Sequence, residues 1–167
     1  IATSKHNPCF GNVYKLVQME ENPVLKVSDD KAKVINPGFQ VTYRIYQNNE
    51  SKADVTCLRG DNLATAIEKG SEILLRDEYD RTKKTRYTEG TYTAEVLQHK
   101  LVENGVRVVP DSTQQQKQDR YLYELSRMNP TERRIINPHY HKVDISDDLY
   151  DLKMGLIYKI KEELNHV

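Results

Sequence analysis

The chain has 167 residues, 37% of them apolar and 30% charged, so we expect one domain with a modest core and a well-solvated surface. Lysine plus arginine and aspartate plus glutamate both number 25, which removes any overall electrostatic attraction to nucleic acid or to an anionic membrane. No apolar run approaches the ~20 residues that span a bilayer, and Cys9 and Cys57 fit neither a disulfide framework nor a zinc motif.

The first part of the chain has the alternation and β-branched content of strands. Val13 to Glu20 alternates, Asn22-Pro23 interrupts it, and Val24 to Val27 resumes as a short second strand. These two strands predict a hairpin that carries Lys15 and Lys26.

A loop with turn-forming residues at both ends follows the first hairpin. Ser28-Asp29-Asp30 offers capping oxygens, and Asn36-Pro37-Gly38 closes the loop. Gln40 to Gln47 then alternates, and residues 48–51 turn the chain into Ala53 to Leu58. This pattern predicts a second antiparallel pair.

The middle of the chain is less regular. Asp61 to Arg76 has mixed signals, because a short helical pattern is interrupted by Gly70 before an apolar run. Asp77 to Gly90 is charged and turn-rich, so we expect an exposed loop containing Lys83-Lys84. Glu95 to Val109 predicts a hairpin around Asn104-Gly105.

The last third predicts helices. Ser112 and Gln115 form a capping-box pattern that opens a helix to about Met128. A short helix over Thr131 to Ile136 and a linker through Val143 are expected next.

A final helix begins after Ser146, a suitable N-cap followed by two aspartates. Its apolar side chains form one stripe at helical spacing: Leu149, Leu152, Leu156, Ile157, Ile160 and Leu164. We interpret the stripe as core or interdomain packing, in preference to a membrane-bound or partner helix. The whole pattern predicts an α+β fold, with antiparallel strands and hairpins followed by C-terminal helices.

Several short motifs occur in one order along nearly the whole chain. Residues 8–17 read PCFGNVYKLV, residues 26–30 read KVSDD, and Lys33 precedes NPG at 36–38. Later come KKT at 83–85, YTAE at 92–95, NPH at 137–139 and LYDLK at 149–153. This series resembles the C-terminal portion of the nicotinate phosphoribosyltransferase family. Asn12 replaces a usual second glycine, and Gln40 replaces a common lysine.

The resemblance implies a cytoplasmic enzyme of NAD salvage that joins nicotinate to phosphoribosyl pyrophosphate, with ATP hydrolysis coupled through a phosphohistidine. It also implies Mg²⁺, a homodimer, and a type II phosphoribosyltransferase with an incomplete α/β barrel beside an α/β domain. The phosphohistidine and the nicotinate-binding residues are implied to lie upstream of Ile1. Residues 1–47 are then the barrel exit with phosphate-side strands, and residues 48–167 are a C-terminal α+β extension ending in an amphipathic helix.

Gly11, Lys15, Lys26 and Lys33 are the candidate phosphate-binding residues. Ammonium groups neutralise phosphate oxygens while Mg²⁺ bridges them, and a glycine lets backbone amides approach. The alternative is that the lysines are ordinary surface residues and Gly11 makes a turn. His139 and His141 have no third ligand, so we assign loop packing or helix-entry contacts and no metal. We assign no catalytic residue.

The start at Ile1 without Met suggests part of a longer polypeptide. We therefore expect an enzyme portion that is silent alone and binds no cofactor by itself, with Mg²⁺ and ATP belonging to the complete enzyme. A non-catalytic interaction or regulatory module that shares the family's tail is the alternative. The sequence upstream of Ile1 separates the two. A nucleic-acid-binding module is disfavoured by the neutral charge.

Overall fold

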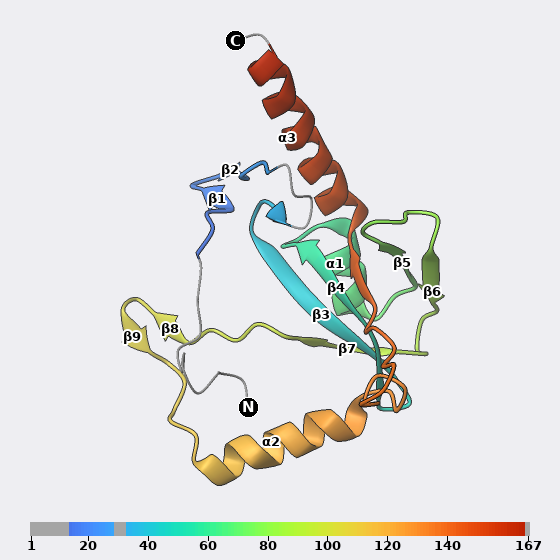
Figure 1. Ribbon diagram of the computed structural model, residues 1–167. Helices are drawn as coiled ribbons and strands as arrows, with labels where there is room; N and C mark the ends of the chain where they lie inside the picture. Colours follow the sequence, from blue (N-terminus) through green and yellow to red (C-terminus); the bar gives the residue numbers. More distant parts are fainter. Residues whose placement is uncertain (1–13, 29–32, 166–167) are drawn as a thin grey trace.

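The computed structural model of the chain describes residues 14–28 and 33–165. Within them, a mixed six-stranded sheet is accompanied by three helices and two small two-stranded hairpins (Figure 1). This α+β fold agrees with the sequence prediction. None of the helices in these described ranges is both long enough and apolar enough to cross a bilayer.

The central sheet combines strands from distant parts of the chain. In spatial order its strands are β6 (Lys84–Tyr87), β5 (Ile73–Asp77), β10 (Val143–Ile145), β4 (Glu50–Leu58), β3 (Gln40–Gln47) and β7 (Thr93–Val96). Neighbours are antiparallel, except that β10 and β4 are parallel. The predicted linker through Val143 is wrong at its end, because Val143 begins strand β10, which inserts between β4 and β5.

The β3–β4 hairpin is the longest pairing in the sheet. Its register runs from Gln40 opposite Leu58 to Gln47 opposite Glu50, with a bulge after Ile45. Asn48 and Asn49 both have positive φ, as a two-residue hairpin turn requires. Strand β3 has the predicted bounds. The boundary that we expected between residues 1–47 and residues 48–167 lies at this turn. Strands from both parts therefore belong to the same sheet.

One face of the sheet carries the core. Alternate residues of the strands point to this face, where α1 (Asn62–Lys69) packs on β4 and β5. The buried cluster consists of Val41, Tyr43, Ile45, Ala53, Val55, Cys57, Ala64, Ile67, Ile73, Leu75, Tyr87 and Tyr92. The region with mixed sequence signals is thus a helix followed by a strand, because Asp61 caps α1 and left-handed Gly70 ends it.

The C-terminal helix α3 (Asp147–Asn165) begins as predicted at Ser146, whose hydroxyl accepts a hydrogen bond from the Leu149 amide at 3.2 Å. Leu149 is fully buried and α3 packs against β4. Most of the apolar stripe is half-buried, whereas Leu164 is exposed because the helix extends beyond the sheet (Figure 1).

Between β7 and β10 the chain leaves the sheet. The hairpin of β8 (Val102–Glu103) and β9 (Val106–Arg107) turns at Asn104-Gly105, as predicted, but with much shorter strands. Helix α2 (Gln114–Arg127) follows. Its capping box is formed by Thr113 and Gln116, one residue later than the predicted pair Ser112 and Gln115. We refer to residues 98–123 as the arm.

Two further predictions are wrong. The expected loop with Lys83-Lys84 contains β6, which is held in place by pairing with β5. The expected helix over Thr131 to Ile136 is a turn, because the Asn129 side chain accepts hydrogen bonds from the Thr131 amide and hydroxyl.

Candidate functional site

The candidate lysines lie on the N-terminal segment and the loop after it. Lys15, Lys26 and Lys33 are all exposed. The Lys15 ammonium donates a hydrogen bond to the Lys33 carbonyl at 3.1 Å, so these two residues are neighbours. Gly11 lies outside the described residues.

The first hairpin has different bounds from those predicted. It consists of β1 (Gln18–Met19) and β2 (Asn22–Pro23), because the chain already reverses at Glu20, which has a φ of 54°. Lys15 therefore precedes β1 and Lys26 follows β2, and the prediction that both lie on strands is wrong. Both lysines are on irregular backbone that a few hydrogen bonds position.

The carbonyl of Val17 joins the N-terminal segment to the loop before β3. It accepts hydrogen bonds from the amides of Val24, at 2.9 Å, and Gly38, at 2.7 Å. Gly38 has a φ of +84° and a Cβ there would lie 2.8 Å from Leu58 Cδ2. The side-chain Nε2 of Gln40 donates a hydrogen bond to the Asn36 carbonyl at 2.6 Å, so the residue that replaces a common lysine stabilises this loop.

A half-open cavity of about 360 Å³ lies between α3 and a group that includes Val27, Ser28 and Val34. It is lined by Val27, Ser28, Val34, Glu78, Tyr79, Tyr150, Lys153, Met154, Ile157, Tyr158 and Lys161. Its Lys153 is already engaged, because the ammonium donates to Glu78 at 2.6 Å and to Asn36 at 2.9 Å. Lys26 and Lys33 are sequence neighbours of lining residues but do not line the cavity themselves.

A cluster of charged side chains lies on the sheet face opposite the core. Arg44 on β3 binds both carboxylate oxygens of Asp54 on β4, at 2.7 and 2.8 Å. His141 lies between two carboxylates, with Nδ1 2.9 Å from Glu132 and Nε2 3.2 Å from Asp54. The contact with Asp54 has the distance of an ion pair but not the geometry of a hydrogen bond.

These contacts change the protonation equilibria. The interaction with Asp54 raises the pKa of His141, partial burial opposes this, and Glu132 adds to the increase. Burial alone would raise the pKa of Asp54, but the hydrogen bonds from Arg44 and the contact with His141 outweigh it and lower that pKa. Both ring nitrogens of His141 thus face carboxylates. These contacts join the segment before β10 to strand β4. Among residues 14–28 and 33–165, no His, Cys, Asp and Glu side chains group in threes as a metal site.

Arg127 holds the end of α2 against the sheet. The sequence analysis assigned no role to this residue. Its guanidinium binds the two carboxylate oxygens of Glu95 on β7, at 2.6 and 3.1 Å. It also lies 3.6 Å from the centre of the Tyr46 ring and 5.0 Å from that of Tyr123. The arginine lowers the pKa of Glu95. The only sequence signal was a basic residue in the last turn of a helix, which is common at helix ends.

Comparisons with known proteins agree on one family. The family model described as "Nicotinate phosphoribosyltransferase C-terminal domain" matches residues 39–153. Nicotinate phosphoribosyltransferase 2 of Arabidopsis thaliana is 28% identical over 154 residues, which are 90% of this chain and 27% of that protein. Nicotinate phosphoribosyltransferase of Bacillus subtilis is 26% identical over 172 residues, covering 98% of this chain and 34% of that protein.

The fold has a relative among solved structures. The crystal structure of human nicotinic acid phosphoribosyltransferase superposes with a TM-score of 0.61 at 19% identity, covering 87% of this chain and 26% of the human chain. The chain therefore spans about a quarter to a third of the length of these relatives. Because the family model covers more than half of the sequence, the chain belongs to the nicotinate phosphoribosyltransferase family, as a C-terminal domain.

Proposed function

We propose that the chain is the C-terminal part of an enzyme that forms nicotinate mononucleotide and pyrophosphate from nicotinate and phosphoribosyl pyrophosphate. ATP hydrolysis is coupled to this reaction, which serves NAD salvage in the cytoplasm. The match of the family's C-terminal domain to residues 39–153 carries the proposal. The partial coverage of the relatives supports a division of labour in which the remaining polypeptide supplies most of the active site.

In this proposal, Lys15, Lys26 and Lys33, with the backbone at Gly11, lie on the phosphate side of the active site. The exposure of the three lysines and the hydrogen bond from the Lys15 ammonium to the Lys33 carbonyl support the assignment, since this bond brings two separate segments together. Ammonium groups would neutralise oxygens of phosphoribosyl pyrophosphate or ATP, and Mg²⁺ would bridge those oxygens. This chain alone binds neither Mg²⁺ nor ATP in the proposal.

The part of the polypeptide upstream of Ile1 then contains the barrel, the phosphohistidine and the residues that hold nicotinate. The complete enzyme is a homodimer with active sites near the subunit boundary. The sequence preceding Ile1 tests this organisation. A barrel there supports the enzyme, whereas an unrelated domain favours the alternative of a non-catalytic interaction or regulatory module.

The lysine roles are tested by steady-state kinetics of Lys26→Ala and Lys33→Ala in the complete polypeptide. Loss of one charge-assisted contact, worth about 1.5–3 kcal/mol, lowers kcat/KM for phosphoribosyl pyrophosphate or ATP by about 10- to 100-fold. Lys69→Ala is the matched control, because Lys69 is an exposed lysine at the end of α1. Kinetics of both variants that equal those of the control would reject the phosphate-binding roles.

A further inference from the structure

The arm is exposed along almost its whole length. Of residues 98–123, all are exposed except Val109, which is half-buried. Helix α2 is 14 residues long, yet burial begins only at Glu124 and becomes complete at Arg127. The first ten residues of α2 therefore project from the sheet (Figure 1).

The arm's own interactions are weak. Its ion pairs, Lys100 with Glu103 and Arg107 with Asp111, are exposed, and such pairs contribute at most about 1 kcal/mol. A helix shorter than about 12–15 residues is marginal in water without packing, and an isolated two-stranded hairpin is also marginal. The described residues therefore give the arm little stability of its own.

The exposed side chains of the arm include large apolar groups. Leu101, Val106 and Val108 lie on the same face of the β8–β9 hairpin, because Leu101 pairs with Val108 and side chains alternate along a strand. Tyr121 and Leu122 are exposed on α2. Tyrosines and aliphatic residues that gather on an exposed element are typical of the centre of a protein interface.

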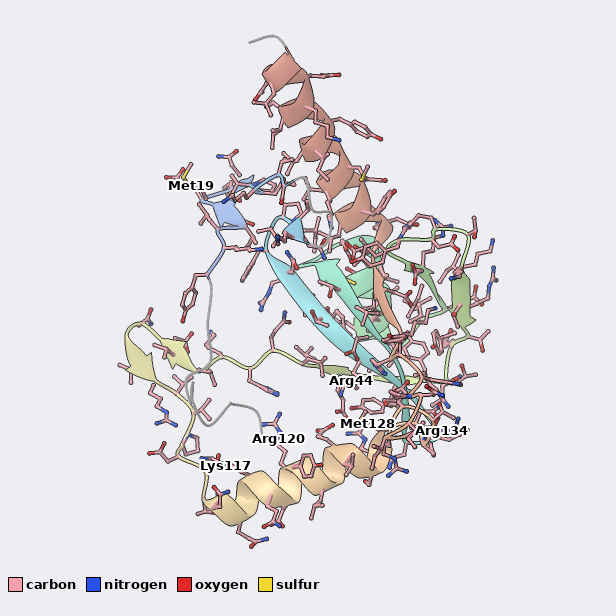
Figure 2. The ribbon with its side chains drawn as sticks, in the orientation of Figure 1. Met19, Arg44, Lys117, Arg120, Met128 and Arg134 are labelled. Carbon is pink, nitrogen blue, oxygen red and sulfur yellow. The ribbon has the colours of Figure 1, made fainter. Side chains whose placement is uncertain are left out.

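The base of the arm is held firmly. Arg127 and Glu95 join the end of α2 to β7, and Asn129 donates to Glu50 of β4 at 2.9 Å. Figure 2 shows Lys117 and Arg120 on the part of α2 remote from the sheet, and Met128 at the end that reaches it. The described part of the fold thus anchors the end of α2 and leaves the apolar side chains of the arm exposed.

We propose that the arm docks on the part of the same polypeptide that lies outside residues 1–167. This inference rests on the proposed function, in which two thirds to three quarters of the enzyme lies outside this chain, as the coverage of the relatives indicates. Covalent linkage gives such a contact an effective concentration in the mM range, so a slender apolar surface is sufficient. A separate partner would require a standard interface of about 1,600 Å².

Hydrogen exchange in the complete polypeptide tests the docking. We expect the amides of residues 117–123 to be protected, and Leu122→Gln to reduce this protection at least about tenfold while β3 and β4 remain protected. Arg120→Gln is the matched control, since Arg120 lies about 200° around the helix from Leu122. Because Leu122 is 52% exposed here, its replacement does not disturb the core of this chain.

Three results would overturn the docking proposal: unprotected arm amides, equal effects of the two variants, or protection that disappears when the protein is diluted until any dimer dissociates. The last result would assign the surface to a second copy. An assay for nicotinate mononucleotide on the same samples separates the two proposals. An active enzyme with an unprotected arm rejects only the docking, and an inactive protein with a protected arm rejects only the function.

Discussion

The sheet and the arm differ in where their stability originates. At the centre of the sheet, Ile45, Ala53, Val55 and Leu75 are completely buried, whereas the arm is almost entirely exposed. The sheet is stabilised by contacts within this chain, since buried apolar area is the main favourable term in folding. The arm has regular backbone without such contacts. Helices and strands of one domain thus form both the buried core in the sheet and, in the arm, an exposed surface that we propose docks on another part of the protein.

The largest difference is expected between matched leucine truncations in residues 1–167. Leu75→Ala leaves a cavity in the core and lowers the free energy of unfolding by about 2–5 kcal/mol. Leu122→Ala on the arm changes it by at most about 0.5 kcal/mol. Denaturant titration measures both values. Similar losses for the two variants would contradict the contrast between sheet and arm.

Arg127 is the junction between the two regions, and its removal is expected to have the next largest effect. The side chain is 5% exposed and binds Glu95, which is about half exposed. Arg127→Ala should cost about 2 kcal/mol, less than a fully buried pair because water screens Glu95. Arg127→Lys keeps the charge but loses the two-pronged bond, so it should recover only part of the loss in the same titration. Full recovery would show that charge alone is sufficient.

Gly38, which connects the N-terminal segment to the sheet, is expected to have a smaller effect. Gly38→Ala places a Cβ on a positive φ and 2.8 Å from Leu58 Cδ2, and should cost about 2 kcal/mol or less. Gly60→Ala is a matched control, because Gly60 has a similar φ of +78° with no atom within 4 Å. The difference between the two unfolding free energies isolates the contact with Leu58. Equal costs would mean that this contact is unimportant.

The smallest effect is expected from the titration of His141. Its pKa is raised in the folded state, so protonated His141 stabilises the fold below its ordinary pKa, and this stability is lost as pH rises through the raised value. Wild type should therefore lose stability relative to His141→Gln as the pH rises above the ordinary histidine pKa of 6.5. Thermal unfolding of both proteins across this range measures the difference. A constant difference would show that the contacts with Asp54 and Glu132 do not depend on the charge.

The sequence predicted elements whose signals are local. The predicted bounds of β3 are correct, because the alternating pattern and the following Asn-Asn turn specify them. The predicted start of α3 is correct, because Ser146 is followed by two aspartates. The predicted position of the α2 capping box is wrong by one residue, because Ser112 with Gln115 and Thr113 with Gln116 fit the same sequence pattern. Only the backbone geometry distinguishes these pairs.

Elements that depend on distant partners could not be predicted. Strand β10 has three residues, and its place between β4 and β5 is determined by pairing with residues far away in the sequence. Arg127 shows the same limit, because its partners Glu95 and Tyr46 meet it only in the folded protein. The candidate lysines were assigned by resemblance, and their roles stay predictions.

Nicotinate mononucleotide formation by residues 1–167 and by the complete polypeptide, measured side by side, tests the central claim most directly. Both assays contain nicotinate, phosphoribosyl pyrophosphate, ATP and Mg²⁺. We predict product from the complete polypeptide and none from residues 1–167. Product from residues 1–167 alone would contradict the account, because the chemistry would then reside in this domain.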